Sequence, residues 1–491
     1  MSQPWSNGLV GATGISYAGT AAEMLLVNRH PAVKAVAPRF SLFDVYTDIA
    51  FPGGVQLAWF TGNWARLNRA LDSNRLPDDV PWYARLAIKG VRPVDEDTNG
   101  VLLAAAVREH ADNYDPHAWA QDVIYRDDIP RGAPGPADSF SPHALCSRHP
   151  RIRGGHLRLQ RLARRRVSAR RHQTLSGARP ADASTHPRAV GPWRPPSDKP
   201  GRSSPTVRFD QAAELLRFFD HHLRGRANGM ESEPPVHYFT MVAETWRTAE
   251  RWPPPSIPWP LYLEAEGRLS PAPANVRGSD GYRGDPGTGS GTATRWRSLL
   301  GGIGAAPYPD RATRDKRLQV YTSAPLPEAV EVTGHPIVRL MVAASTPDAA
   351  VFAYLEDVDE QGRGELRHGR SAPSPPQKNG LQARRSGAPV PQRTFVRIHG
   401  QPLNPGVPVE LAFDLLPTSW LFLKGHAVRL AVAAADADYF AQVPAGDLPI
   451  LDVHRGGPGG SRIDLPASRA SRTDIAPPPS RHNRHRTVAE S

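Results

Sequence analysis

The chain has few of the features that mark secreted, disulfide-stabilised or membrane-spanning proteins. Cys146 is the single cysteine in 491 residues, which excludes an internal disulfide framework and a cysteine-based metal site. No apolar run reaches the ~18 residues that a transmembrane helix needs. The N-terminus also lacks the charged-then-apolar pattern of an export signal. The sequence therefore predicts a soluble, cytoplasmic protein without a membrane partner, and its 39% hydrophobic content suffices for two or three domains.

The net charge of +12 suggests a nucleic-acid partner until its position along the chain is considered. Residues 148–202 contain 15 basic and two acidic residues, whereas the rest of the chain has 45 basic and 46 acidic residues. This window has almost no aromatic residues that could stack on bases. We therefore expect no nucleic-acid partner, and a window that stays disordered because it contains few large apolar residues.

A nucleophile elbow is the most informative motif of the chain. Gly14–Gly19 fits the pattern G-x-S-x-G, preceded by an apolar run at Gly8–Ala12 and followed by helix-forming residues at Tyr17–Asn28. In a strand-turn-helix of this kind, Ser16 is the nucleophile and the Tyr17 backbone amide donates to the developing oxyanion. The alternative is a Gly/Ser-rich turn without chemistry, because short motifs recur by chance.

The wider sequence resembles the CocE/NonD type of serine hydrolases, which includes cocaine esterase, α-amino-acid ester hydrolases, glutaryl acylases and X-Pro dipeptidyl-peptidases. The resemblance is carried by short motifs in all three thirds of the chain: Trp5–Gly8, Gly14–Gly19, Ala35–Pro38, Phe43-Asp44, Phe218–Leu223, Glu233–Val236, Glu244–Arg247, Leu318–Ala324, Val332–Pro336, Leu355–Val358 and Leu415–Trp420. It implies an α/β-hydrolase domain with a helical cap and a C-terminal all-β jelly-roll domain.

The resemblance also implies the chemistry. Members cleave esters, amides or X-Pro dipeptidyl bonds through an acyl-enzyme, so we expect a small-molecule ester, amide or short peptide substrate and no cofactor or metal. Trp59, Phe60 and Trp64 match the family's cap, where aromatic side chains line an acyl pocket. The alternative is that these rings only pack the core of the cap.

The catalytic acid and base of the family are absent in frame. Read one base out of frame, residues 161–175 and 188–193 are compatible with the motifs that carry this Asp and His, which places them in the slots of Arg164 and Pro192. A second shifted window is expected at about 364–392. The sequence therefore predicts a frame disruption, and the upstream strands of the hydrolase sheet are also expected to be missing. The second functional hypothesis is thus a catalytically inactive fragment whose β domain serves in interactions.

These observations predict a division of the chain. We expect the nucleophile strand and helix in 1–41, the helical cap in 42–143, a disordered out-of-frame segment in 144–205, the end of the hydrolase domain in 206–250, the jelly roll in 256–466 and a disordered tail in 467–491.

Finer expectations concern single segments. A helix at 210–223 should place Leu216, Phe219 and Leu223 on one face. Residues 266–316 should form a long loop. Six β-strands are predicted, at Leu261–Glu264, Leu318–Thr322, Val338–Val342, Val351–Leu355, Val409–Phe413 and Ala427–Val432.

Two further clusters are weaker candidates. His221 and His222 are adjacent in a helix, where metal-binding pairs need a spacing of four residues, so we expect no metal site there. Asp436 and Asp438 could pair for acid/base catalysis, but a solvated turn is the favoured interpretation.

Overall fold

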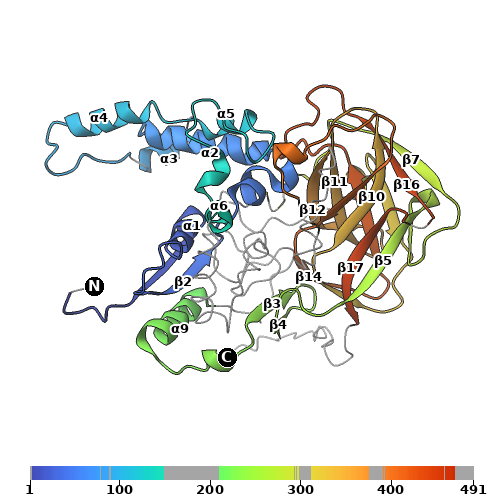
Figure 1. Ribbon diagram of the computed structural model, residues 1–491, viewed down its shortest axis with the longest axis horizontal. Helices are drawn as coiled ribbons and strands as arrows, with labels where there is room; N and C mark the ends of the chain where they lie inside the picture. The colour runs from blue at the N-terminus through green and yellow to red at the C-terminus, as the bar shows by residue number, and fades with distance from the viewer. Residues whose placement is uncertain are drawn as a thin grey trace, which may run out of the picture.

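The computed structural model describes residues 3–77, 79–87, 90–148, 210–291, 294, 296–297, 311–374, 391, 393–457 and 459–469. Three parts are visible in Figure 1: a small α/β unit, a row of helices beside it, and a large β domain at the other end. Within these residues no helix combines the length and the hydrophobicity that a membrane crossing requires.

The α/β unit contains the elbow. Strands β1 (Val10–Ile15) and β2 (Val33–Arg39) pair in parallel, and helix α1 (Tyr17–Met24) connects them. The strand-turn-helix expectation is thus confirmed, although α1 ends four residues before Asn28. Strand β2 alternates buried and half-buried residues, as expected for a strand that is covered on one face.

Helix α9 (Gln211–Arg224) returns to this unit from the far side of the chain. It is capped by Asp210, whose carboxylate accepts hydrogen bonds from Ala212 N and Ala213 N at 3.0 Å each. Phe219 and Leu223 lie against Gly11 of β1. The expectation for Leu216 is wrong, because its side chain is 62% exposed. The apolar stripe continues one position earlier, at the half-buried Leu215.

The segment expected to form the cap is a row of short helices. Its main helix α2 (Ala58–Asp72) packs against α5 (Pro116–Gln121). The other elements are η1 (Tyr46–Ala50), η2 (Pro52–Gly54), α3 (Trp82–Ala87), α4 (Val101–His110), η3 (Ala137–Phe140) and α6 (Pro142–Arg148). Helix α6 corrects the predicted boundary, since residues 144–148 are helical and Ala144 is buried. The remainder of the 144–205 segment that follows α6 lies outside the described residues.

A hairpin of β3 (Val236–Thr240) and β4 (Thr245–Ala249) leads into the β domain, whose strands form a 13-stranded sheet folded into a sandwich. Along the sheet the order is β12-β11-β15-β8-β6-β5-β17-β10-β16-β7, with β13 on β10, and β9 joining β17 to β14. The strands are β5 (Ile257–Glu264), β6 (Arg268–Ser270), β7 (Gly278–Arg283), β8 (Gln319–Ser323), β9 (Val330–Gly334), β10 (Ile337–Ala344), β11 (Ala349–Val358), β12 (Gly364–Ser374), β13 (Val409–Asp414), β14 (Thr418–Phe422), β15 (Ala427–Ala433), β16 (Ile450–Arg455) and β17 (Arg462–Arg469).

All six predicted strands are present, but two negative expectations are wrong. The segment 266–316 was expected to be a loop, yet it contains β6, β7 and the short helix α10 (Ala312–Asp315). The tail was expected to start at 467, yet β17 extends to Arg469 and pairs there with β9. In the second shifted window, residues 364–374 form the edge strand β12, whose backbone pairs with β11 over its whole length. Backbone pairing needs no particular side chains, so it tolerates a changed sequence.

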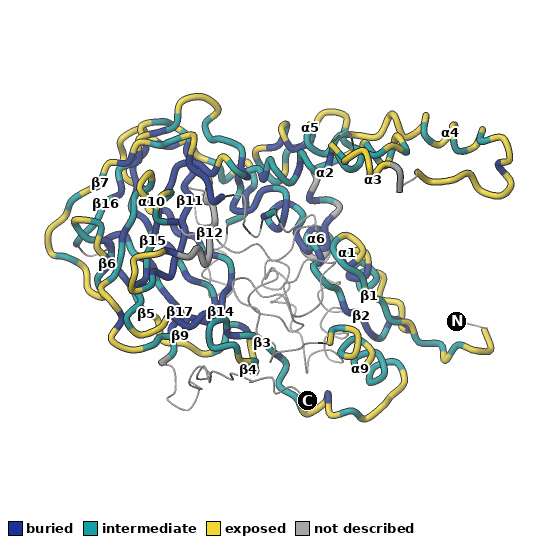
Figure 2. Tube along the Cα trace, turned by 180° about the vertical axis from the view of Figure 1, so that it is seen from behind, coloured by how far each residue is buried: buried dark blue, intermediate teal, exposed yellow. Residues whose placement is uncertain are grey.

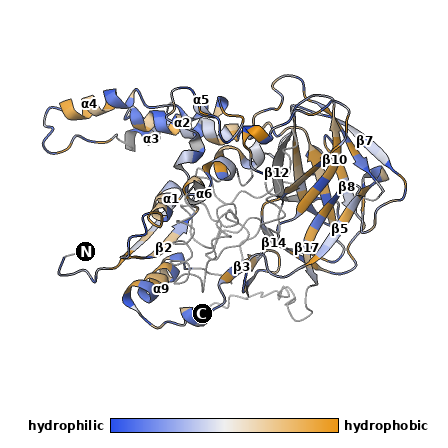
Figure 3. Ribbon diagram, viewed as in Figure 1, coloured by the Kyte–Doolittle hydropathy of each residue, from blue (hydrophilic) through white to orange (hydrophobic). Residues whose placement is uncertain are grey.

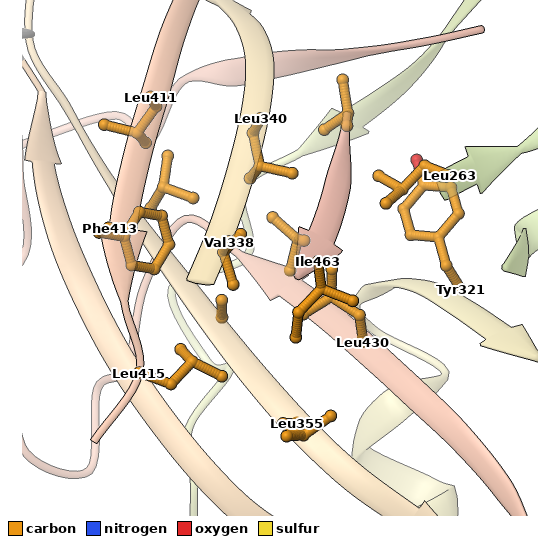
Figure 4. Packing of buried hydrophobic residues seen from close by; sticks show 14 of the residues in the cluster. Leu263, Tyr321, Val338, Leu340, Leu355, Leu411, Phe413, Leu415, Leu430 and Ile463 are labelled. Carbon is orange, nitrogen blue, oxygen red and sulfur yellow. The ribbon is translucent and has the colours of Figure 1, made fainter. Parts of the chain in front are cut away.

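Side chains from both faces of the sandwich fill its core. Figure 4 shows Val338, Leu340, Leu411 and Ile463 converging from β10, β13 and β17, and each is at most 2% exposed. The hydropathy colouring of Figure 3 shows the same concentration of apolar residues on these strands. Burial of each such side chain contributes about 1.5–3 kcal/mol, so this domain has the largest core of the described chain.

A charged cluster is buried beside a second apolar cluster of the β domain, which includes Tyr354. The Arg311 guanidinium is 0% exposed, donates to Glu356 at 2.7 Å and lies over the Tyr354 ring at 4.6 Å from its centroid. Asp315 and Arg429 complete the cluster with an ion pair of 3.0 Å. Burial raises the pKa of Glu356 to about 8, although the charge of Arg311 opposes this shift. Burial therefore favours the protonated form of the Glu356 carboxyl.

Candidate active site

Ser16 occupies a strained turn between β1 and α1. Its φ of 58° and ψ of −127° lie in a region that side-chain-bearing residues rarely adopt. Two glycines make the turn possible: a Cβ on Gly14 would lie 2.3 Å from the Ala18 backbone, and one on Gly19 would lie 2.8 Å from the Arg39 carbonyl oxygen. The pattern of glycines around Ser16 thus has a steric reason, and the geometry is that of a nucleophile elbow.

Hydrogen bonds fix the backbone of the elbow on both sides. Ser16 N donates to Arg39 O of β2 at 3.0 Å, and the Ser16 carbonyl accepts from Thr20 N at 3.0 Å. The Thr20 hydroxyl accepts from Leu42 N at 2.8 Å, so the loop after β2 is tied to the first turn of α1. Among the described residues, the Tyr17 amide has no acceptor. It is a free donor at a helix N-terminus, the position from which an oxyanion can be bound.

Aromatic rings from the cap approach the elbow. The Tyr17 side chain is 68% exposed, and its ring centroid lies 6.2 Å from that of Trp64 on α2. Phe60 stacks on Trp64 with centroids 6.2 Å apart and an interplanar angle of 8°. Trp59 packs edge-on against Tyr439 of the β domain at 5.7 Å, and Phe60 also packs against the apolar cluster that contains Tyr439. The structure therefore brings Trp64 to the elbow, with Phe60 stacked behind it, while Trp59 and Phe60 join the cap to the β domain.

The slots assigned to the catalytic acid and base, Arg164 and Pro192, lie outside the described residues. No described histidine is joined to Ser16 by a hydrogen bond. The described elbow therefore holds a serine in a strained turn and, beside it, one backbone amide without an acceptor among the described residues.

A buried charge cluster joins the loop after β2 to the helical segment that follows it. Arg126 donates to Asp44 at 2.7 Å and to Asp138 at 3.0 Å, and its side chain is 10% exposed. His143 lies 3.5 Å from the Asp138 carboxylate and 3.1 Å from the guanidinium. Burial alone would raise the pKa of Asp138, but His143 and Arg126 together lower it to about 2.

Asp44, Asp138 and His143 form the one group of possible metal ligands within the described residues. Arg126 already pairs with both carboxylates, so the cluster is an ion-pair network and its charge does not favour an added cation. Sequence analysis missed this network, because Asp44 and Arg126 are 82 positions apart. The Phe43-Asp44 motif was the only signal, and it indicated the family without indicating a partner.

The weaker candidates take structural roles. His221 lies 3.2 Å from the Arg226 carbonyl oxygen, and the ring of His222 packs on Phe218. The solvated-turn interpretation is wrong for Asp436, which is 2% exposed and accepts a hydrogen bond from Ser290 N at 3.0 Å. Burial raises the pKa of Asp436. Asp438 accepts from Gly291 N at 2.7 Å, so both carboxylates hold the 285–291 loop.

Two models of known protein families match parts of the chain. Residues 1–134 match the sequence model of the X-Pro dipeptidyl-peptidase (S15 family), and residues 228–461 match that of the X-Pro dipeptidyl-peptidase C-terminal non-catalytic domain. The elbow and the helices up to α5 fall in the first match, and the β-sandwich except β17 falls in the second.

Relatives extend over nearly the whole chain. A predicted serine esterase of Mycobacterium bovis is 43% identical over 505 aligned positions, covering 94% of this chain and 77% of the relative. Cocaine esterase of a Rhodococcus species is 25% identical over 467 positions, covering 89% and 74%.

Solved structures share the fold. An aminopeptidase from a marine sediment archaeon superposes with a TM-score of 0.61 at 19% identity, covering 95% of this chain and 77% of that one. An α-amino acid ester hydrolase gives 0.59 at 19% identity, covering 94% and 77%. These likenesses confirm an α/β-hydrolase with a C-terminal β-sandwich. The chain therefore belongs to the CocE/NonD-type serine hydrolases, a family of enzymes that includes esterases and X-Pro dipeptidyl-peptidases.

Proposed function

We propose that Ser16 is the nucleophile of a serine hydrolase site that cleaves ester or amide bonds through an acyl-enzyme. The observation that carries the proposal is the elbow itself: a serine at φ 58° between strand β1 and helix α1, with glycines at the two positions where a Cβ would collide with backbone. A backbone strain of this kind costs about 1–3 kcal/mol and persists only where the surrounding structure enforces it. Such strained residues concentrate at active sites.

The chemistry follows from the groups around the turn. The Ser16 hydroxyl attacks the substrate carbonyl, its proton passes to a general base, and the carbonyl oxygen becomes an oxyanion. The Tyr17 amide has no acceptor among the described residues and donates to this oxyanion. The leaving alcohol or amine takes a proton, and water then releases the acid from the acyl-enzyme. No cofactor takes part in these steps.

The acyl group of the substrate lies against the cap in this proposal. Phe60 and Trp64 present stacked rings, and the exposed Tyr17 ring continues the wall toward Ser16. Aromatic rings favour flat or bulky apolar groups, because such groups bury their surface against a ring face. The substrate class is thus a small ester, amide or short peptide with an apolar acyl portion.

A second candidate function is supported by the residues in the acid and base slots. Arg164 lacks the carboxylate that would orient a catalytic histidine, and Pro192 cannot act as a general base. A serine hydroxyl without a base is a poor nucleophile at neutral pH. In this case the elbow is intact, turnover is lost, and the β domain serves in interactions.

Active-site labelling and turnover separate the two candidates. A fluorophosphonate probe is added to the full chain and to Ser16→Ala, and the modified residue is located by mass spectrometry of tryptic peptides. Hydrolysis of an aryl ester is measured in parallel. The matched control is Ser73→Ala, because Ser73 is an exposed serine at the end of α2.

The hydrolase candidate expects one adduct on Ser16, loss of labelling in Ser16→Ala and unchanged labelling in Ser73→Ala. Turnover of about one per second or faster would show that a base is supplied. Absence of both label and turnover supports the second candidate. Labelling that persists in Ser16→Ala would refute the assignment of the nucleophile.

A further inference from the structure

A loop of the β domain enters the helical cap. Residues 393–400 lie between β12 and β13 and contain the short helix η8 (Arg397–His399), which Figure 1 shows in orange beside α5. Figure 2 shows the cap from behind: it is largely buried or half-buried next to the β domain and exposed at its far end, at α4. We call residues 393–400 the seam loop, because they join the β domain to the cap.

The seam loop inserts one aromatic side chain into the cap. Phe395 is 6% exposed and packs in the apolar cluster that contains Tyr46 and Phe51, with its ring centroid 5.6 Å from that of Tyr46. Its φ of 57° lies in the left-handed region, which bulky residues rarely adopt. In this conformation the Phe395 carbonyl oxygen accepts a hydrogen bond from Arg126 N at 2.8 Å. One residue thus holds both the apolar cluster and the backbone of Arg126.

Arg397 fastens the seam loop to the same segment of the cap. Its backbone amide donates to the Asp127 carboxylate at 2.8 Å, and its guanidinium donates to Asp128 Oδ1 at 3.0 Å and 2.6 Å. The guanidinium also lies over the Tyr125 ring, 4.7 Å from the ring centroid. The second Asp128 oxygen accepts from Tyr125 N at 2.9 Å. Residues 125–128 are therefore held as one turn against the seam loop.

The same turn reaches the elbow through the Arg126 side chain. The guanidinium is buried and donates to Asp44 at 2.7 Å, and Asp44 lies five residues after the end of β2. Between them, Leu42 N donates to the Thr20 hydroxyl at 2.8 Å, and Thr20 N donates to the Ser16 carbonyl oxygen at 3.0 Å. The loop after β2 is therefore held at one end by the first turn of α1 and at the other end by Arg126.

We propose that Phe395 and Arg397 are positioning residues for Ser16, through which the β domain sets the geometry of the elbow. The inference rests on the proposed function, because it takes Ser16 as the nucleophile. Placement matters at such a site, since a displacement of about 1 Å caused by a change far from the chemistry can lower a rate about a hundredfold. Both residues act through the turn 125–128, which carries Arg126.

The order of action follows from the contacts. Phe395 places the backbone of Arg126, and the Arg126 guanidinium holds the loop after β2. That loop also bonds the Thr20 hydroxyl, so its displacement pulls on the first turn of α1. The turn follows Ser16 and begins with the amide of Tyr17, so the hydroxyl and the oxyanion donor shift together.

Hydrogen exchange of the folded full chain tests this coupling without any need for turnover. In Phe395→Ala we expect the amides of Ser16 and Leu42 to exchange about tenfold faster at a temperature where the chain stays folded, because the loop after β2 loses its anchor. The matched control is Phe413→Ala, since Phe413 is 4% exposed in the core of the sandwich. Its replacement should change the exchange of the same two amides by less than about twofold.

Milder variants separate positioning from bulk stability. Phe395→Leu keeps an apolar side chain in the cluster, so exchange at the elbow should return to within about threefold of the parent. Arg397→Ala should accelerate exchange about threefold, a smaller effect because the Arg397 side chain is 61% exposed, and it carries the same test should Phe395→Ala not fold. Arg363→Ala is its control: it breaks an exposed ion pair with Asp359 elsewhere in the β domain and should leave the elbow unchanged.

Fluorophosphonate labelling gives a second readout. Phe395→Ala should lower the second-order rate constant for labelling of Ser16 about tenfold, and Phe413→Ala should leave it within about twofold of the parent. A parent chain that does not label at Ser16 would reject the proposed function, whereas the exchange rates decide by themselves whether the seam loop positions the turn. Exchange at the elbow that is unchanged in Phe395→Ala and Arg397→Ala, or that rises equally in Phe413→Ala, would overturn the inference.

Discussion

Arg126→Met is the sharpest test of the ion-pair network beside the elbow. Methionine retains the apolar length of the side chain but removes the charge that both carboxylates need. The side chains of Asp44 and Asp138 are only 2% and 12% exposed, so water cannot solvate them after the substitution. Breaking a buried pair in this way costs about 3–5 kcal/mol. This is a large part of the 5–15 kcal/mol that typically stabilises a domain.

The assay is urea unfolding followed by tryptophan fluorescence, with hydrogen exchange assigning the transition to the cap. We expect Arg126→Met to lower the midpoint of the cap transition, whereas Arg131→Met should leave it unchanged, because the Arg131 side chain is 91% exposed. Without Arg126 the pKa of Asp138 rises, so the variant should recover stability relative to the parent as the pH falls from 7 to 5. Equal midpoints for both variants, or a loss that does not depend on pH, would refute the reasoning.

Three further outcomes follow from the described contacts. Burial raises the pKa of Glu356 to about 8 in the folded chain. The stabilisation that this carboxyl contributes should therefore be full below pH ~4.5 and be lost as the pH rises through about 8. Glu356→Gln should flatten this decline in thermal melts. Phe395→Ala should destabilise the cap by about 3–4 kcal/mol in urea unfolding, since Phe395 is 6% exposed and packs on Tyr46. Gly14→Ala should expose α1 to hydrogen exchange, because its Cβ would lie 2.3 Å from backbone, whereas Gly135→Ala, with its nearest contact at 3.6 Å, should not.

The sequence predicted those parts of the fold that depend on local pattern. The glycines around Ser16 predicted the elbow, because only glycine fits where a Cβ would meet Ala18 and Arg39. Short alternating or apolar runs predicted β10 and β13, whose apolar side chains Val338, Leu340, Leu411 and Phe413 are buried in the core. In α9 the same approach chose Leu216 for the buried face, whereas Leu215 is the more buried of the two. With two adjacent leucines, the sequence alone does not tell which one faces the core.

Contacts between distant segments could not be predicted in this way. Asp436 resembles a turn residue in sequence, but its partner Ser290 lies 146 positions away and buries it. The same holds for Asp44 and Arg126, neither of which has a neighbour in sequence that indicates a partner. Strand β7 was not predicted, because Gly278–Arg283 is rich in glycine and polar residues. Its pairing with β16 outweighs this poor β-propensity.

The way in which the β domain holds the cap restricts how such proteins can recombine. Phe395, with a φ of 57°, sits in the cap cluster of Tyr46, Phe51, Ala120 and Val123, and its carbonyl oxygen accepts from Arg126 N at 2.8 Å. Arg397 adds an ion pair of 2.6 Å to Asp128. A gene that exchanged this β domain for another would also have to replace the cap residues that receive Phe395 and Arg397. We therefore expect cap and β domain to be inherited together, with chimeras joined between them expressing poorly unless both sides of the seam come from one parent.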